Sequence, residues 1–340
     1  MRKLLNTLYV TTTEAYLSKD GMNVVISVKQ QEVFRIPIIN IEGIVTFGYM
    51  GASPGLMKLC ADNGVSLTFL SPNGRFVSRV QGQTMGNVLL RKAQYRLADD
   101  EQWSLHVAQL FVAGKIQNYR NVLRRYIRDY GENTDVENAV KTLDMEKRDA
   151  LRSTDKVALM GIEGRAANCY FSVFPYLILQ QKADFPFTGR NRRPPKDAVN
   201  AMLSLAYTLL ANDTAAALET VGLDPYVGLF HTLRPGRTSL ALDVMEELRA
   251  YLGDRFVLSL INKRQVTLND FLYQGEKGVV MTEKGRKTFL TAWQNRKKEV
   301  IIHPYLNEKV PIGLLPYVQA MLLARYVRND IDDYPVFLFK

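Results

Sequence analysis

The stretch "NVLLRKAQYRLADDEQWSLHVAQLFVAGKIQNYRNVLRRYIRDYG", residues 87–131, decides the fold class. Its apolar side chains recur at steps of three and four residues, which is the spacing of one face of an α-helix. They include Leu105, Ala108, Phe111, Val112, Ile116 and Tyr119. Nearly every strong segment from there to about residue 330 has the same period. The exceptions are "GVVM" (278–281) and "VIIHPY" (300–305), which are either short strands or extended turns.

The residues before this stretch have the pattern of strands. Short segments rich in β-branched and aromatic residues alternate with turn signals in "NVVISV" (23–28), "EVFRIPI" (32–38), "GIVTFG" (43–48) and "VSLTFL" (65–70). "SPNG" (71–74) predicts a hairpin, and "SPGLMKLCADNG" (53–64) predicts a capped helix. We therefore expect a β-rich domain at 1–82, a linker at 83–88 and a helical domain at 89–340.

Composition narrows the class of protein. Of the 340 residues, 47% are hydrophobic and 23% charged, as in a folded globular chain. Lys and Arg total 44 against 34 for Asp and Glu, and the net charge of +10 favours a polyanionic partner such as nucleic acid, although an ordinary basic enzyme remains an alternative. No apolar run reaches the roughly 18 residues of a membrane span, and the N-terminal residues lack the pattern of a signal peptide. We expect a cytoplasmic protein with no membrane contact.

Two segments concentrate arginine. "YRNVLRRYIRDY" (119–130) is either a phosphate-binding surface or a solvated helix face. "TGRNRRPPK" (188–196) places Arg190, Arg192, Arg193 and Lys196 on a loop that two prolines keep from becoming helical. Because these like charges repel each other unless an anion joins them, this loop is the stronger candidate for gripping phosphates.

Carboxylates and one of the chain's three histidines gather in "GLFHTLRPGRTSLALDVMEELR" (228–249). Thr238 or Ser239 can cap a helix there, and the helix has an apolar stripe formed by Ala241, Val244, Met245, Leu248 and Leu252. Asp243, Glu246 and Glu247 then share the opposite face, which is either a ligand-binding face or ordinary solvated surface. His231 ends an apolar run before a rigid turn, where it either packs or projects into a cleft.

A third segment, "LMGIEGRAANCYF" (159–171), supplies Glu163 amid small residues. Gly161 and Gly164 would allow another element to approach closely, so Glu163 is expected to be partly buried. A buried carboxylate needs a partner, and the candidates are a bound cation, Arg165 or a solvent channel. One imidazole and two carboxylates suit Mg²⁺ or Mn²⁺ and do not suit a structural zinc site, and a hard cation flanked by arginines is what phosphodiester chemistry needs.

Three segments together resemble one family. "GIEGRAANCYF" (161–171), "RPPKDAVNAMLSLAYTLL" (193–210) and "GLDPYVGLFHTLRPGRTSLALDVMEELR" (222–249), in this order after a β-rich region, resemble the CRISPR-associated adaptation integrases and endonucleases, the first of the numbered Cas proteins. The resemblance covers essentially the whole chain. It implies an α+β fold, with a small N-terminal β-sandwich-like domain followed by a larger all-helical catalytic domain. The compact length and the tail "NDIDDYPVFLFK" (329–340) are most similar to the type I-C subgroup.

The resemblance also implies roles for individual residues. Glu163, His231 and Glu246 match the family's ligands of Mg²⁺ or Mn²⁺, and Asp243 matches an acidic residue that assists catalysis as an acid or from behind the ligands. Glu247 matches no ligand and is expected at the surface, while Asn200 is expected to be structural. The expected DNA contacts are Tyr207, Arg234 and Arg249, together with Arg190, Arg192 and Arg193 of the basic loop.

The function implied by the resemblance is an enzyme that inserts short double-stranded DNA fragments into a CRISPR array, through attack of a 3′-hydroxyl on a phosphodiester. The implied assembly is a homodimer formed by the β domain, with two such dimers flanking a dimer of a small ferredoxin-like CRISPR-associated protein in a heterohexamer. Two alternatives stay open. One is a general metal-dependent nuclease acting on branched or single-stranded DNA, and the other is a non-catalytic DNA-binding scaffold whose acidic cluster is structural.

Overall fold

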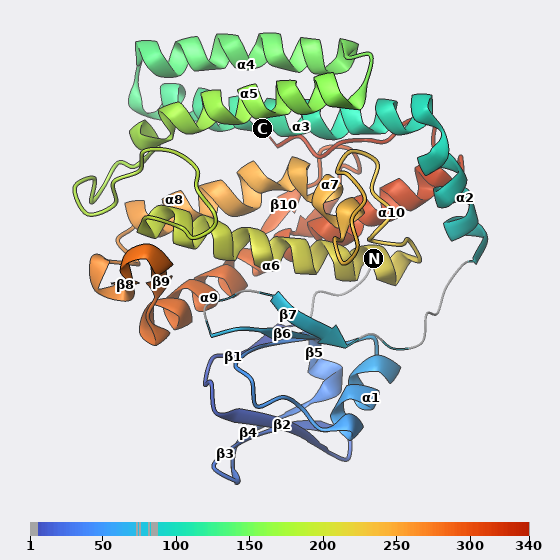
Figure 1. The fold of residues 1–340 in the computed structure, drawn as a ribbon, viewed down its shortest axis with the longest axis vertical. Helices are drawn as coiled ribbons and strands as arrows, with labels where there is room; N and C mark the ends of the chain where they lie inside the picture. Colours follow the sequence, from blue (N-terminus) through green and yellow to red (C-terminus); the bar gives the residue numbers. More distant parts are fainter. Residues whose placement is uncertain (1–5, 73, 75, 81, 83–87, 340) are drawn as a thin grey trace.

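The computed structural model describes residues 6–72, 74, 76–80, 82 and 88–339, and Figure 1 shows strands at one end of the molecule with helices stacked beyond them. The expected linker, 83–88, lies outside the described residues except for Val88. The strand-rich part contains β1 (Asn6–Val10), β2 (Ala15–Asp20), β3 (Asn23–Val28), β4 (Gln31–Pro37), η1 (Ile38–Asn40), β5 (Ile41–Phe47), α1 (Pro54–Asp62), β6 (Ser66–Leu70) and β7 (Phe76–Val80).

Two sheets form this part. One has the order β1-β5-β6-β7, with parallel β1/β5 and β5/β6 pairs and an antiparallel β6/β7 pair, and the other is an antiparallel β2-β3-β4 meander. The connection from β5 to β6 runs through α1, because parallel neighbours need a crossover. Ser53 caps α1 by accepting a hydrogen bond from the Leu56 N–H, as the sequence predicted.

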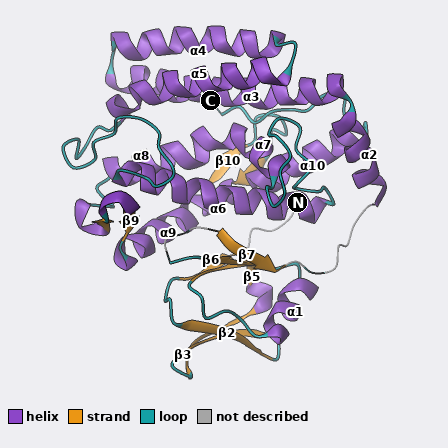
Figure 2. Cartoon of the chain, viewed as in Figure 1, coloured by secondary structure: helices purple, strands orange, loops and turns teal. Residues whose placement is uncertain are grey.

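The remaining chain is mostly helical. Its helices are α2 (Val88–Asp99), α3 (Glu101–Tyr130), α4 (Thr134–Arg152), α5 (Lys156–Val173), η2 (Phe174–Leu177), α6 (Ala198–Val221), α7 (Ser239–Leu248), η3 (Arg249–Asp254), α8 (Arg255–Asn262), η4 (Leu268–Asp270), η5 (Gly275–Lys277), α9 (Glu283–Lys298), η6 (Ile312–Leu314) and α10 (Leu315–Val327). Two short antiparallel ladders interrupt them: β8 (Phe271–Tyr273) with β9 (Val279–Met281), and β10 (Val300–Ile302) with β11 (Lys309–Pro311). Figure 2 shows these strands as isolated pieces among the helices.

The central strands β5 and β6 of the four-stranded sheet are buried on both faces and join the two parts. Ile44 and Phe69 point into the core shared with α1 and the meander, whereas Val45, Phe47 and Leu70 point into the core of the helical part. Neighbouring residues of a strand face opposite sides of a sheet. A strand that is buried on both faces therefore needs apolar side chains at nearly every position, which explains the near-continuous apolar runs of β5 and β6.

The expected order of a strand-rich region followed by a helical one is confirmed. "GVVM" and "VIIHPY" contain short strands, which was one of the two alternatives for them, so the C-terminal region is mostly but not entirely helical. Helix α3 lies at the centre of the helical part, packed against α4, α5 and α7. In the described part of the chain, no helix is both long and apolar enough to cross a membrane.

Candidate active site

Helix α7, which carries Asp243, Glu246 and Glu247, is surrounded by protein. Its residues are buried except for Leu242, and α3, α6 and α10 pack around it. Of the two alternatives for the face that carries these carboxylates, the solvated surface is therefore excluded. The amphipathic pattern was real, but each carboxylate on the polar side has hydrogen-bond or ion-pair partners from other elements.

Glu247 is the clearest correction, because it is fully buried and not at the surface. Its carboxylate accepts hydrogen bonds from the Tyr334 hydroxyl, from the Phe337 N–H at 2.5 Å and from Gln319 Nε2 at 3.1 Å. Burial raises the pKa of Glu247 to about 7, although these hydrogen bonds favour the ionised form. Glu247 thus anchors the C-terminal segment against α7.

Glu163 and Glu246 converge on a lysine that the sequence did not single out. Lys115 of α3 is 1% exposed, and its Nζ forms ion pairs with Glu163 Oε1 and, at 2.7 Å, with Glu246 Oε2. Glu163 comes from α5 and is 23% exposed, whereas Glu246 comes from α7 and is 2% exposed. The two glutamates expected to share a cation are therefore brought together, with an ammonium between them.

Glu246 also has partners on its other side. Arg249 Nη1 lies 2.9 Å from Glu246 Oε1, and His231 Nε2 lies 3.8 Å from the same oxygen. Burial alone would raise the pKa of Glu246, but the charges of Arg249, Lys115 and His231 outweigh it and lower the pKa to about 2. Glu246 is therefore ionised at neutral pH, as a metal ligand must be.

Asp243 holds His231 in place. It is fully buried, and its Oδ1 lies 2.6 Å from His231 Nδ1. The backbone N–H groups of Leu229, Phe230 and His231 donate to the same carboxylate at 2.6, 3.0 and 2.8 Å. Because all these contacts tie Asp243 to the loop before α7, it orients the imidazole and leaves Nε2 facing Glu246. This places Asp243 behind His231, one of the two positions expected for it.

The donor set fits a hard divalent cation. Two carboxylates meet at the Lys115 ammonium, and His231 Nε2 lies beside one of them, 3.8 Å from Glu246 Oε1. Asp243 contacts the other ring nitrogen, Nδ1, and so leaves Nε2 free to face Glu246. Among the described residues, no three His, Cys, Asp or Glu side chains are already grouped as ligands of one ion. Glu163, His231 and Glu246 supply the donor atoms that could hold such a cation.

Two expectations about the Glu163 segment are wrong. A Cβ added at Gly164 would meet nothing within 4 Å, and one at Gly161 would meet only the Arg165 side chain at 3.8 Å, so neither glycine mediates a close approach. Arg165 is not the partner of Glu163, because it forms a two-pronged ion pair with Glu146 of α4, at 2.9 Å for each contact. The partner of Glu163 is instead Lys115 of α3, which forms an ion pair with its carboxylate.

Tyr207 links the arginines near the site. Its hydroxyl donates to Asp254, and the guanidinium carbons of Arg190 and Arg249 lie 5.3 and 4.7 Å from its ring centroid. Arg249, Gly253 and Asp254 reach Tyr207 because η3 is a π-helical segment that widens the turn after α7. An added Cβ at Gly253 would lie 2.7 Å from the Tyr207 ring.

The expected DNA contacts divide into two groups. Arg190 donates to Asn200 Oδ1 at 2.7 Å and to Ser204 Oγ at 3.2 Å, and Asn200 is fully buried, in its expected structural role. Arg190 and Arg249 are therefore held within the protein. The other group, Arg192, Arg193 and Arg234, is exposed.

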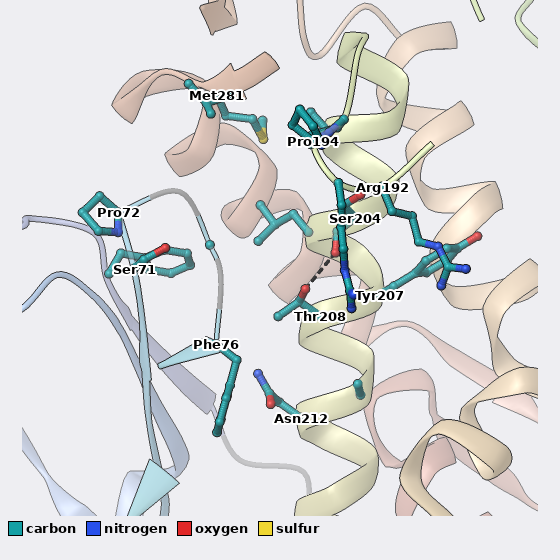
Figure 3. Close-up of a pocket in the computed structure, with 18 of the residues that line it drawn as sticks. Ser71, Pro72, Phe76, Arg192, Pro194, Ser204, Tyr207, Thr208, Asn212 and Met281 are labelled. Carbon is teal, nitrogen blue, oxygen red and sulfur yellow. Dashed lines mark hydrogen bonds between the residues drawn. The ribbon is translucent and has the colours of Figure 1, made fainter. Parts of the chain in front are cut away.

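A cleft of about 1490 Å³ lies between the strand-rich part and α6, and Arg249 is among its lining residues. Figure 3 shows Ser71, Pro72 and Phe76 on one wall, facing Ser204, Thr208 and Asn212 of α6, while Tyr207 extends from the other side of that helix. Arginines line much of it, namely Arg79, Arg190, Arg192, Arg193, Arg237, Arg249 and Arg286. Arg249, which pairs with Glu246, also lines this cleft, whereas Glu163, His231 and Glu246 are not among its lining residues.

The family match accords with this geometry. The sequence pattern of CRISPR associated protein Cas1 matches residues 8–295. The chain belongs to the Cas1 family. The CRISPR-associated endonucleases Cas1 1 of Chlorobaculum tepidum and Cas1 2 of Rhodospirillum rubrum are 50% and 46% identical to it, each over 100% of both chains.

Solved structures of similar fold include a Cas1 protein from Thermotoga maritima, with a TM-score of 0.83 and 21% identity over 98% of this chain and 99% of that one. A casposase bound to integration product has a TM-score of 0.84 and 21% identity over 98% of this chain and 93% of that one. At 21% identity, these two matches show that the fold is similar and nothing more.

Sequence reasoning about this Cas1 family chain missed Lys115 and three arginines of the cleft, Arg79, Arg237 and Arg286. For Lys115 there was a signal. It lies four residues after Phe111 and four before Tyr119, inside the apolar stripe of its helix. A lysine in that stripe predicts a buried ammonium that needs anionic partners.

Proposed function

We propose that this Cas1 family endonuclease joins short DNA fragments to a CRISPR array, with the 3′-hydroxyl of the fragment attacking a phosphodiester at the repeat boundary. The observation that carries the proposal is the convergence of Glu163 and Glu246 on one buried position, with His231 Nε2 alongside. The identity with curated endonucleases along the whole chain supports the same reaction class.

We propose Glu163, His231 and Glu246 as the ligands of Mg²⁺ or Mn²⁺. A bound divalent cation supplies a Lewis acid for the phosphoryl oxygen and a means to orient the attacking hydroxyl. Asp243 keeps the imidazole pointing at that position through Nδ1, so we propose it as a positioning residue. Arg249 balances the charge of Glu246 from the other side, and burial of this cluster strengthens each electrostatic contact.

The DNA would approach along the arginine-lined cleft. We propose that Arg192, Arg193 and Arg234, which are exposed, contact phosphates directly. Arg190 and Arg249 flank Tyr207, so we propose that these three form a preordered surface beside the reacting strand. The net charge of +10 favours double-stranded DNA as the partner of this surface.

We further propose that the protein works as a homodimer through its strand-rich part, in a heterohexamer with a small ferredoxin-like CRISPR-associated protein in the cytoplasm. Tyr16, Val33 and Phe34 are exposed on the β2-β3-β4 sheet, which supports an interface there. A Cas6-RT-Cas1–Cas2 complex contains a chain of which 36% matches this fold, with a TM-score of 0.84. The chain's length and its C-terminal tail remain the support for the type I-C subgroup. Light scattering at micromolar concentration tests the dimer, and a monomer would remove it.

Strand transfer tests the reaction. A labelled short duplex, a supercoiled plasmid carrying the repeat, the small partner and Mn²⁺ are mixed with the wild type, Glu163→Ala or Glu246→Ala, with the exposed Glu132→Ala as the control. We expect the wild type and Glu132→Ala to join label to the plasmid, and both site variants to lose more than about 100-fold of this activity. Degradation without joining would favour a general nuclease. Equal joining by all variants would place the chemistry elsewhere, and salt-sensitive binding without any reaction would favour a scaffold.

A further inference from the structure

Lys115 occupies the position between the two glutamates of the site. It comes from the middle of α3, and its ammonium contacts Glu163 Oε1 and Glu246 Oε2 while lying 5.7 Å from the Tyr119 ring centroid. A lysine that is 1% exposed has lost nearly all its hydration, so its charge is tolerated only where anions surround it. Both anions are residues proposed above as metal ligands.

The two glutamates depend on this lysine unequally. Glu246 has a second cation, since Arg249 Nη1 lies 2.9 Å from its Oε1. Among the described residues, the cationic side chain that forms an ion pair with Glu163 is Lys115. Without the lysine, two carboxylates facing one buried position would repel each other, and Glu163 would lose the cation that contacts it directly.

We propose that Lys115 is a built-in counter-ion of the metal site, which holds Glu163 and Glu246 together before a divalent cation binds and competes with that cation for the same oxygens. The inference rests on the metal site of the proposed function. An ammonium and a divalent cation cannot both occupy the space between the two carboxylates, because their charges repel and the oxygens that they need are the same. Lys115 must therefore move away from at least one glutamate as the cation enters.

Two opposite consequences follow from removing the charge. Lys115→Met keeps a long unbranched side chain in α3 but leaves the carboxylates facing each other, so the metal-free protein becomes less stable. The same change removes the competitor and raises the energy of the metal-free state, so the protein binds a divalent cation more tightly. A residue that only packs α3 against α5 and α7 would lower stability without raising affinity.

Calorimetric titration of the full chain with Mn²⁺, combined with thermal unfolding in EDTA and in Mn²⁺, separates these cases. We expect Lys115→Met to bind Mn²⁺ at least about tenfold more tightly than the wild type and to melt at a lower temperature in EDTA. Its melting temperature should also rise more than that of the wild type when Mn²⁺ replaces EDTA. Lys147→Met is the matched control, because Lys147 pairs with Asp144, which keeps Arg120 and Arg148. Lys147→Met should match the wild type in Mn²⁺ affinity and in the rise of melting temperature that Mn²⁺ causes.

Lys115→Arg keeps the charge and covers the case in which Lys115→Met is too unstable to study in EDTA. We expect it to stay folded without metal and to bind Mn²⁺ no more tightly than the wild type, and a tenfold gain by this variant would overturn the inference. Folding of Lys115→Met only in Mn²⁺ would support it.

The outcomes also distinguish this inference from the proposed function. If the wild type binds Mn²⁺, Glu163→Ala does not, and Lys115→Met binds no more tightly than the wild type, the metal site stands and the counter-ion role is wrong. If the wild type binds no Mn²⁺, or if Glu163→Ala binds it equally well, both proposals fall.

Discussion

The Asp243 carboxylate shows how one residue sets the geometry of its neighbours. It accepts hydrogen bonds from three consecutive backbone N–H groups as well as contacting His231 Nδ1, and it does so without exposure to solvent. A Cβ added at Gly228 would lie 2.9 Å from Asp243 Oδ2 and 2.5 Å from the Ser239 Cβ, so glycine is required for this approach. The orientation of the His231 imidazole is therefore set by Asp243, which is not itself a proposed metal ligand.

Replacing Asp243 by Asn tests this role. The amide oxygen of Asn can still accept from the backbone, but it supplies no charge, and its NH2 group must face donors, so the fixed orientation of His231 is lost. We expect Asp243→Asn to weaken Mn²⁺ affinity by about 10- to 100-fold and to lower strand transfer accordingly. Calorimetry measures the affinity, with the exposed Asp129→Asn as control. Wild-type affinity in the Asp243 variant would contradict the positioning role.

Asp254 gives a pH dependence of stability. Burial raises its pKa to about 6, against the opposing effects of the Tyr207 hydrogen bond and of Arg249. Because the folded state holds this proton more tightly than the unfolded state, the stabilisation is complete below about pH 4 and is lost as the pH rises toward 6. The free energy of unfolding should fall by up to about 1.4 kcal/mol per pH unit in this window from this group alone.

Denaturant unfolding between pH 4 and pH 7 measures the effect of Asp254→Asn. The variant should show a shallower fall in the free energy of unfolding than the wild type. Asp129→Asn is the control, because a hydrogen bond from Arg128 lowers the pKa of Asp129 and its titration lies below this window. An unchanged slope in Asp254→Asn would show that Asp254 is ionised throughout.

Among elements, the register of α3 against α7 is set by the C-terminal segment. Asn118 Nδ2 donates to the carbonyl oxygens of both Glu247 and Phe337, at 2.7 and 2.8 Å, and the chain end lies beside α3 in Figure 1. A Cβ added at Gly114 would lie 2.1 Å from Val336 Cγ1. Since Lys115 follows Gly114 and Glu246 precedes Glu247, the tail fixes the two elements that bring the ammonium and a carboxylate together.

Gly114→Ala and Gly164→Ala form a matched pair that separates helix propensity from packing. Alanine is favoured over glycine by about 1 kcal/mol in a helix interior. At Gly164 the new methyl group meets nothing within 4 Å, so that variant should be more stable by up to about 1 kcal/mol. At Gly114 the clash with the tail should outweigh the propensity gain, with a net loss of about 1–2 kcal/mol. Denaturant unfolding measures both, and a stabilised Gly114→Ala would show that the tail moves aside freely.

The sequence predicted individual elements better than their contacts. β3 and the capped helix α1 follow from local alternation and capping, and these signals lie within a few residues of each other. The start of helix α7 was predicted at Thr238 or Ser239, but the predicted apolar stripe continued to Leu252, beyond the observed end at Leu248, and the polar face was misread. The groups that cover Glu247 belong to Gln319, Tyr334 and Phe337, more than seventy residues away, and no local pattern reports them.

The candidate site shows the same limit. Glu163, His231, Asp243 and Glu246 were identified through their motifs, and the structure brings all four together. Lys115 was missed because its role depends on the meeting of α3, α5 and α7. The two-sided contacts of Arg249, with Glu246 and with Tyr207, depend on the π-helical turn, which has no signature in the sequence that could have been read beforehand.

At the scale of the whole molecule, one ion cluster joins the strand-rich part to the helices. Lys297 of α9 is 4% exposed, and its Nζ lies 3.2 Å from Glu42 of β5, from Asp213 of α6 and from the Thr7 hydroxyl of β1. Burial alone would lower the pKa of Lys297, but the charges of Asp213 and Glu42 outweigh it and raise the pKa. This lysine helps to fix the sheet that forms one wall of the arginine-lined cleft.

Lys297→Met should therefore weaken the junction between the two parts. Removing one member of a buried ion cluster costs about 3–5 kcal/mol where the remaining charges stay dry. Glu42 and Asp213 are 17% and 27% exposed, so water can reach them and we expect a smaller loss, about 2–3 kcal/mol. Denaturant unfolding measures it, with the neighbouring exposed Lys298→Met expected to change stability by less than about 0.5 kcal/mol. If both variants matched the wild type, other contacts, such as the apolar packing of Val45, Phe47 and Leu70 and the Arg79–Glu219 ion pair, would be enough to hold the two parts together.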